Sequence, residues 1–239
     1  MPGTMLELER IDTFRGPAQI LRGVSLAVND GEAVCLVGRN GAGKTTTIDS
    51  IMGLLPVRAG TVAFRGRDIT RLPAHERALL GIGYAPEDAG IFPDLTVEEN
   101  FQITSWLARP REAAAPADGY TRIFSLFPEV KAFLGRRGLH LSGGQKKMVA
   151  ISRAMTLGPS VLLLDEPFEG LAPVVVTRFI EAVKAIKALG VSVLIAESNL
   201  VNATRVADRL YAIDRGEIIF HGRPQDVFAN EDVMKTVRG

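Results

Sequence analysis

Residues 33–46 read AVCLVGRNGAGKTT: an apolar run, a glycine-rich loop and the start of a helical pattern. The loop fits the spacing G-x-x-x-x-G-K-[ST] through Gly38, Gly43, Lys44 and Thr45. Because glycine has no Cβ, the backbone N–H groups of such a loop can turn toward phosphate oxygens, and the following helix N-terminus adds partial positive charge. The Lys44 ammonium can reach the β- and γ-phosphates, and the Thr45 hydroxyl can ligate Mg²⁺. The sequence therefore predicts a phosphate-binding loop.

Apolar runs typical of strands recur along the chain and alternate with helical patterns. The strand-like runs are Leu6–Ile11, Ala33–Val37, Thr61–Phe64, Ile82–Ala85, Val161–Leu164, Val191–Ala196 and Leu210–Asp214. Some are continuous Val/Ile/Leu stretches, which is typical of strands that are buried on both faces of a parallel sheet. Helical patterns cover Thr45–Leu54 and Pro173–Leu189, and Gly190 ends the second of them. The alternation predicts an α/β fold with a parallel-sheet core and crossover helices.

In two regions the sequence predicts antiparallel strand pairing instead. Within the first 65 residues, the runs Leu21–Val28 and Thr61–Phe64 stand among turn residues, which predicts an antiparallel β subdomain of short strands. Near the C-terminus, Leu210–Asp214 and Glu217–His221 flank the pair Arg215-Gly216, which predicts a hairpin.

Strand signals disappear over residues 88–150. Thr96 and Glu99 have the spacing of a capping box that opens a helix through Leu107. A Pro/Ala-rich stretch then breaks the pattern before a second helix around Tyr120–Phe127. We therefore predict one domain over residues 1–239, in which an inserted helical subdomain (88–150) interrupts a nucleotide-binding core with its β subdomain (1–87 and 151–239).

Composition excludes several classes of protein. The 28 basic and 27 acidic side chains nearly balance, which argues against a protein that holds nucleic acid by its phosphates. The longest purely apolar run without glycine has five residues, whereas a membrane-spanning helix needs about 20. The N-terminus lacks the pattern of a signal peptide, and the single cysteine, Cys35, excludes an intramolecular disulfide. We expect a soluble, intracellular chain with no nucleic-acid partner.

Two acidic residues directly follow the aliphatic run Val161–Leu164. A carboxylate at the end of a buried parallel strand faces the crevice in which α/β sheets bind ligands. We expect Asp165 to hold Mg²⁺ together with Thr45, and Glu166 to orient or deprotonate the water that attacks the γ-phosphate. The alternative is that both acids merely cap the helix that follows.

Residues 141–145 read LSGGQ. Ser142 and Gln145 have capping-box spacing, so the simplest interpretation is an ordinary helix start. That interpretation does not explain Gly143 and Gly144, each of which costs about 0.8–1.0 kcal/mol of helix propensity relative to alanine. A ligand that approaches bare backbone amides would explain them, as a second anion site at a helix N-terminus. Two such sites about a hundred residues apart suggest a nucleotide held between two copies of the fold.

The segments GRNGAGKTT, LSGGQ and VLLLDEP, in this order and spacing, resemble those of the ATP-binding subunits of ABC transporters, and the resemblance covers the whole chain. It implies the ABC ATPase variant of the P-loop NTPase fold and an ATP hydrolase that works as a homo- or heterodimer of ATPase subunits. Such a subunit is cytoplasmic and sits on the inner face of the membrane through separate integral permease subunits. Within the family, GIGYAPEDAGIFPDLTVEEN, DEPFEGLAP and DVFANEDVMKTVRG resemble most the LivF-type ATPase of branched-chain (hydrophobic) amino acid importers, which implies a periplasmic solute-binding protein as an indirect partner.

The resemblance assigns roles to particular residues. The contacts to ATP fall on Phe14, Gly38, Asn40, Gly41, Ala42, Gly43, Lys44, Thr45 and Thr46. The Mg²⁺ ligands would be Thr45, Asp165 and Glu87, and Glu87 stands at a position where the family usually has Gln. Glu166 and Lys44 fall on the catalytic positions. From the partner subunit, the γ-phosphate would be covered by the residues that correspond to Ser142, Gly143, Gly144 and Gln145.

Two further segments resemble contact surfaces of the family. Glu169–Ala172 resembles the loop that crosses the dimer interface. Asp88–Asn100 resembles the surface that receives a coupling helix from the membrane subunit. Phe92 and Leu95 either supply its apolar contacts or pack inward into the core.

Two positions depart from the family pattern. Ser198 stands where the family usually has a switch histidine, and the histidines at 75, 140 and 221 are interpreted as surface residues. Because the loss of one preorganised donor typically costs about 10²–10³ in rate, we predict that this chain's own site hydrolyses slowly and that a different ATPase partner supplies the histidine at the other site. The usual adenine-stacking aromatic is replaced by Arg15, so Phe14 is favoured for stacking, with Arg15 or plain core packing of Phe14 as alternatives.

Other functions within the family are weighed against amino acid import. Urea or amide import and export of lipid or lipopolysaccharide use a similar cassette. A soluble ABC ATPase that maintains DNA would carry long coiled coils between the two motifs, whereas only about a hundred residues separate Lys44 from Ser142, with no sustained heptads. A translation-factor ATPase would carry two cassettes, and this chain has one.

Overall fold

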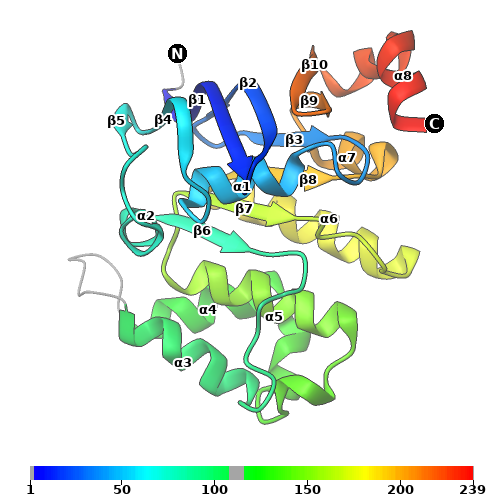
Figure 1. The fold of residues 1–239 in the computed structure, drawn as a ribbon. Helices are drawn as coiled ribbons and strands as arrows, with labels where there is room; N and C mark the ends of the chain where they lie inside the picture. Colours follow the sequence, from blue (N-terminus) through cyan, green and yellow to red (C-terminus); the bar gives the residue numbers. More distant parts are fainter. Residues whose placement is uncertain (1–2, 108–115, 239) are drawn as a thin grey trace.

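The computed structural model describes residues 3–107 and 116–238 and contains two sheets with helices on both faces of the larger one (Figure 1). The larger sheet has the strand order β10-β9-β3-β8-β7-β6. Its strands are β3 (Ala33–Val37), β6 (Ile82–Ala85), β7 (Val161–Asp165), β8 (Ser192–Glu197), β9 (Arg209–Asp214) and β10 (Glu217–Gly222). All neighbours pair in parallel except β9 and β10. The predicted parallel-sheet core is confirmed.

The central strands of this sheet are buried on both faces, as continuous apolar runs require. Every residue of β3, β7 and β8 is buried. Alternate residues of β3 enter different cores: Val34 and Leu36 pack toward the N-terminal sheet, and Cys35 packs toward the helices on the other face. The sheet therefore separates two apolar cores.

The smaller sheet is antiparallel, with the order β2-β1-β4-β5. It consists of β1 (Thr4–Arg15), β2 (Ala18–Asn29), β4 (Val57–Phe64) and β5 (Arg67–Asp68). The expectation of short strands was wrong for β1 and β2, which have 12 residues each. Register shifts in the pairing of β1 with β2 and of β1 with β4 let these long strands bend around the core beneath them.

The helices are α1 (Lys44–Met52), α2 (Ala74–Leu80), α3 (Val97–Leu107), α4 (Pro116–Leu126), α5 (Gly143–Thr156), α6 (Pro173–Ala188), α7 (Leu200–Val206) and α8 (Glu231–Arg238), with 3₁₀ turns at Pro128–Phe133, Gly138–His140 and Pro224–Ala229. Helix α1 lies between the two sheets, and α3, α4 and α5 gather on the far side of the larger sheet (Figure 1). No helix in the described ranges is both long and apolar enough to span a membrane.

Local signals in the sequence explain most helix and turn positions. The Thr96 N–H donates to Glu99 Oε2 at 2.7 Å and the Glu99 N–H donates to Thr96 Oγ1 at 3.1 Å, which confirms the capping box before α3. Arg215 and Gly216 have φ of 46° and 82°, as a two-residue hairpin turn requires. The second helix of the middle region begins at Pro116 rather than near Tyr120, because proline at the first helical position loses no hydrogen bond. The Pro/Ala-rich residues 108–115 lie outside the described part of the chain.

Candidate functional site

The phosphate loop connects the end of β3 to the start of α1, at the carboxyl edge of the parallel sheet. Gly43 has φ of 117°, a conformation that residues with a side chain rarely adopt, and a Cβ there would also lie 2.9 Å from Leu21 Cδ2. A Cβ on Gly38 would lie 2.4 Å from the carbonyl oxygen of Ile213 in β9. The need for glycine at 38 therefore comes also from close packing of the loop against β9, which the sequence did not indicate.

Lys44 lies across this loop and is 5% exposed. Its Nζ donates to the carbonyl oxygens of Gly38 at 2.8 Å and Arg39 at 3.1 Å. The same Nζ lies 3.0 Å from Glu166 Oε1, and both side chains are buried. A buried ammonium within a glycine-rich loop offers the charge that a phosphate group needs.

Asp165 ends β7 with both carboxylate oxygens buried and without a hydrogen-bond partner among the described residues. Burial raises the pKa of Asp165 to about 6, while the nearby Thr45 hydroxyl acts in the opposite direction. A buried carboxylate with free oxygens beside a hydroxyl is the donor set that Mg²⁺ prefers. These two residues therefore fit a magnesium ion.

Glu87 lies in the loop after β6, near the same end of the sheet. Partial burial and the neighbouring carboxylates of Glu169 and Glu166 raise the pKa of Glu87. Its negative charge also contributes to the raised pKa of Asp165, which places Glu87 near the predicted metal ligands. In the described part of the chain, no group of three or more His, Cys, Asp or Glu side chains is arranged to hold a metal ion by itself.

Glu166 is held by contacts from three directions. Its φ is 45°, in the left-handed region that few non-glycine residues adopt, and its N–H donates to the Ala196 carbonyl oxygen at 2.9 Å. Its Oε2 accepts hydrogen bonds from the backbone N–H and the hydroxyl of Ser198, each at 3.0 Å. The structure thus brings Ser198, Lys44 and Glu166 together, and Ser198 acts on the carboxylate of Glu166.

Two residues that sequence reasoning missed lie beside Glu166. Glu197 ends β8, is 1% exposed, and has a pKa raised to about 7, mainly by burial. The signal that could have revealed Glu197 is an acid directly after an aliphatic run, the same pattern that predicted Asp165. Lys147, in α5, donates through Nζ to the carbonyl oxygen of Glu166. No local pattern in the sequence indicates that contact.

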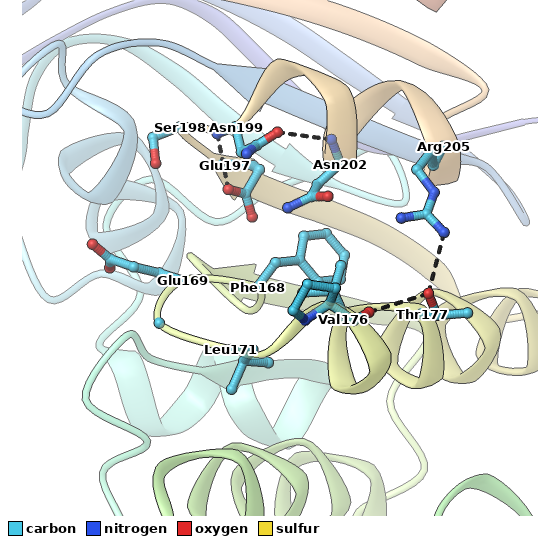
Figure 2. A pocket seen from close by; sticks show the side chains of 12 residues that line it. Phe168, Glu169, Leu171, Val176, Thr177, Glu197, Ser198, Asn199, Asn202 and Arg205 are labelled. Carbon is cyan, nitrogen blue, oxygen red and sulfur yellow. Dashed lines mark hydrogen bonds between the residues drawn. The ribbon is translucent and has the colours of Figure 1, made fainter.

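A pocket of about 490 Å³ adjoins this cluster. Figure 2 shows side chains from the loop after β7 and the start of α6 on one wall, and side chains from the end of β8 and from α7 on the other. Glu169, Glu197 and Ser198 all line it. The predicted interface loop, Glu169–Ala172, therefore shares this pocket with Glu197, the carboxylate that ends β8.

The LSGGQ segment begins α5. Ser142 is the N-cap, with the Gln145 N–H donating to Ser142 Oγ at 3.3 Å and the Ser142 N–H donating to Gln145 Oε1 at 3.0 Å. A Cβ on Gly143 would meet nothing within 4 Å, and one on Gly144 would make ordinary contacts with Leu171 and Val175. No hydrogen bond or ion pair within the described ranges joins this segment to the phosphate loop.

The remaining predicted residues occupy varied positions. Arg15 donates to Asp49 Oδ2 at 2.6 Å and to Thr46 Oγ1 at 3.3 Å, so it reaches the first turn of α1. Phe14 is half-buried, with the Arg58 guanidinium 5.3 Å from its ring centre. Phe92 is 47% exposed, so the alternative that it packs into the core was wrong. Leu95 is half-buried, and the three histidines are exposed, as interpreted.

A parallel sheet with a phosphate loop after β3 and two carboxylates at the end of β7, which is separated from β3 by β8, defines a P-loop nucleotide hydrolase. The family model described as ABC transporter matches residues 21–169. A high-affinity branched-chain amino acid transport ATP-binding protein, BraG of Pseudomonas aeruginosa, is 33% identical over 98% of this chain and 100% of its own. The lipopolysaccharide export system ATP-binding protein LptB of Haemophilus influenzae is 37% identical over 99% and 98%.

Among solved structures, the ADP conformation of MJ1267, an ATP-binding cassette of an ABC transporter, has a TM-score of 0.83 with 29% identity, and the match covers 99% of each chain. The chain belongs to the ABC transporter ATP-binding family. It has the ABC ATPase fold and is an ATP hydrolase, as predicted.

Proposed function

We propose that this chain is the ATP-hydrolysing subunit of an importer for branched-chain or other hydrophobic amino acids. It would bind the cytoplasmic side of separate permease subunits, and a periplasmic solute-binding protein would deliver the solute to them. The observation that supports amino acid import is the full-length similarity to BraG, together with the segments around Gly81–Asn100 and the C-terminus that resemble LivF-type subunits.

The ATP site is proposed to form at the carboxyl edge of the larger sheet. The N–H groups of residues 38–46 and the N-terminus of α1 would bind the triphosphate, and Lys44 would exchange its contacts to Gly38 and Arg39 for phosphate oxygens. Thr45, Asp165 and Glu87 would hold Mg²⁺, which supplies charge neutralisation for the β- and γ-phosphates. The aromatic face for adenine would be Phe14, with Arg15 as the alternative.

Glu166 is proposed to act on the attacking water. Its carboxylate accepts from Ser198 and faces Lys44, so it is oriented before any substrate arrives. The water would lose a proton to Glu166 as its oxygen bonds to the γ-phosphorus and the bond to ADP breaks. Because Ser198 donates to Glu166 and is shorter than the usual histidine, we propose that hydrolysis at this chain's own site is slow, and that a different ATPase subunit supplies a histidine at the second site.

The γ-phosphate is proposed to be covered by a partner subunit's signature segment, in a head-to-tail dimer. Among the described residues no side-chain clash requires glycine at 143, since a Cβ there would meet none of their atoms within 4 Å. A ligand or partner that approaches the bare amides of Gly143 and Gly144 supplies the missing reason. In this arrangement residues 88–150 form the helical subdomain that presents the segment, and Glu169–Ala172 meets the partner.

The ATP site is tested with two variants of the purified chain. Lys44→Ala should lose ATP binding in an equilibrium titration, and Glu166→Gln should retain binding while hydrolysis falls by roughly 10²–10⁴-fold. Lys146→Ala, a lysine in α5 without a side-chain hydrogen bond among the described residues, is the control for loss of a positive charge. Unchanged binding in Lys44→Ala would overturn the phosphate-loop assignment.

A second candidate function is lipopolysaccharide or lipid export, because LptB is as similar to this chain as BraG is. The two are distinguished by reconstitution with the permease subunits that co-purify with this chain. Stimulation of ATP hydrolysis by leucine, isoleucine or valine together with a binding protein supports import. Stimulation by lipopolysaccharide instead would replace it by export, and stimulation by urea or short amides would leave the ATP site assignment standing with a different solute.

A further inference from the structure

Lys147 connects the helix that carries the signature segment to the end of β7. It lies in the second turn of α5, five residues after the N-cap Ser142. Its Nζ donates to the backbone carbonyl oxygen of Glu166. The contact therefore joins two segments that are 19 residues apart in sequence and belong to different parts of the fold.

The contact falls on a backbone position that is unusual by itself. Glu166 has φ of 45°, a conformation that non-glycine residues rarely adopt unless surrounding contacts hold it. Its N–H is fixed by the Ala196 carbonyl oxygen of β8, and its carbonyl oxygen is fixed by Lys147 of α5. The direction of the carboxylate toward Ser198 and Lys44 depends on both contacts, since they fix the peptide groups on either side of the Cα atom.

The ammonium of Lys147 also lies among four carboxylates. Glu87, Glu166, Glu169 and Glu197 all act on its charge. Glu87 follows β6, Glu166 and Glu169 follow β7, and Glu197 is the last residue of β8. Burial lowers the pKa of Lys147, and these four carboxylates oppose that shift. Lys147 is therefore a cation of α5 that acts on the same acidic end of the sheet as Lys44.

We propose that Lys147 is a positioning residue that holds Glu166 in its hydrolytic orientation and ties that orientation to the placement of the signature helix. The inference rests on the proposed role of Glu166 in hydrolysis. Any movement of α5 relative to the larger sheet pulls on the peptide group that directs the carboxylate. Through the Lys147 side chain, the placement of the signature segment is coupled to hydrolysis within one chain.

Three variants test the proposal with ATP as the ligand. Lys147→Met keeps the aliphatic stem and removes the donor, Lys147→Arg keeps a donor, and Lys146→Met changes the adjacent lysine of the same helix, whose side chain makes no hydrogen bond among the described residues. We expect Lys147→Met to lower kcat by roughly 10- to 100-fold, because a small misplacement of a catalytic group costs about this much, while KM and ATP affinity change by less than about twofold. Lys147→Arg should recover at least half of the activity, and Lys146→Met should match the wild type.

A second measurement separates damage to Glu166 from damage to the signature segment. In the Glu166→Gln background, ATP-induced dimerisation is measured by light scattering with and without Lys147→Met, with the partner subunit added if the chain does not dimerise alone. Dimerisation that persists shows that the signature segment still functions. Thermal melting establishes that the variants fold, and Lys147→Gln replaces Lys147→Met if the latter unfolds.

The outcomes decide between the inference and the function on which it rests. Wild-type kcat in Lys147→Met, equal losses in Lys146→Met, or a loss confined to ATP affinity would each overturn the inference about Lys147. Full hydrolysis in Glu166→Gln would instead overturn the role of Glu166, whatever Lys147 does. Loss of dimerisation in the double variant would assign Lys147 to the signature segment rather than to Glu166.

Discussion

Replacing Glu197 by Gln tests how the buried acids at the end of the sheet affect stability. Glu197 is 1% exposed at the end of β8. One of its oxygens accepts the Asn199 N–H at 2.9 Å, and Oε2 has no hydrogen-bond partner among the described residues. A buried charge with so few donors is costly, and burial accordingly raises the pKa of Glu197 from 4.5 to about 7.

The sign and size of the effect follow from this shift. Since the folded state binds the proton more tightly than the unfolded state, the stability contributed by the neutral carboxyl group is complete below about pH 4.5 and is lost as the pH rises through about 7. One pKa unit corresponds to about 1.4 kcal/mol, so the whole loss is about 3 kcal/mol. Gln has the same shape and no charge, so above pH 8 the free energy of unfolding of the variant should exceed that of the wild type by up to about 3 kcal/mol.

Urea unfolding followed by circular dichroism measures the free energy of unfolding of both proteins at pH 5.0 and 8.5. The difference between variant and wild type should grow with pH, whatever its value at pH 5.0. Glu217→Gln, at an exposed position in β10, is the matched control and should show no such growth. A difference for Glu197→Gln that is equal at both pH values would refute the reasoning, because the carboxyl would then titrate alike in the folded and unfolded chain.

Three other predictions concern Arg77, whose side chain contacts the end of α1, Ser198 at the position of the family's switch histidine, and the residue that stacks on adenine. Arg77 is 2% exposed and donates hydrogen bonds to the carbonyl oxygens of Ser50, Ile51, Thr70 and Leu72. Arg77→Met should therefore lower the free energy of unfolding, measured in urea, by about 3 kcal/mol. Arg71→Met, at an exposed position, is the control and should not lower it. Ser198→His should raise ATP turnover of the purified chain by about tenfold or more in a phosphate-release assay, and an unchanged rate would contradict the explanation of slow hydrolysis. Phe14→Ala should weaken ATP binding about fivefold in a fluorescence titration; if Arg15→Ala weakens it and Phe14→Ala does not, the arginine stacks on the purine.

Features that depend on residues near in sequence could be predicted from the sequence. The phosphate loop, the capping boxes at Thr96 and Ser142 and the hairpin turn at Arg215-Gly216 each involve residues within a few positions of one another. The buried strands were recognisable because the runs Ala33–Val37, Val161–Leu164 and Val193–Ala196 are apolar on both faces. The start of α4 was misplaced because proline signals a break and the first residue of a helix equally well.

Contacts between distant segments could not be predicted in this way. Arg77 follows Ser50 by 27 residues, and Lys147 precedes Glu166 by 19. In the sequence both are ordinary charged residues on helices, where exposure to solvent is the default expectation. Their roles arise only because the fold brings backbone carbonyl oxygens within their reach.

The geometry around Glu166 follows from the order of the strands. β7 and β8 are parallel neighbours, and Asp165 lies opposite Ala196 in their register. Glu166, the residue after Asp165, therefore lies beside the end of β8, and its N–H donates to the Ala196 carbonyl oxygen. Ser198, two residues after Ala196, reaches the Glu166 carboxylate for the same reason. The departure at Ser198 is consequently a change in how the catalytic acid is held, and its effect should appear in kcat far more than in the affinity for ATP.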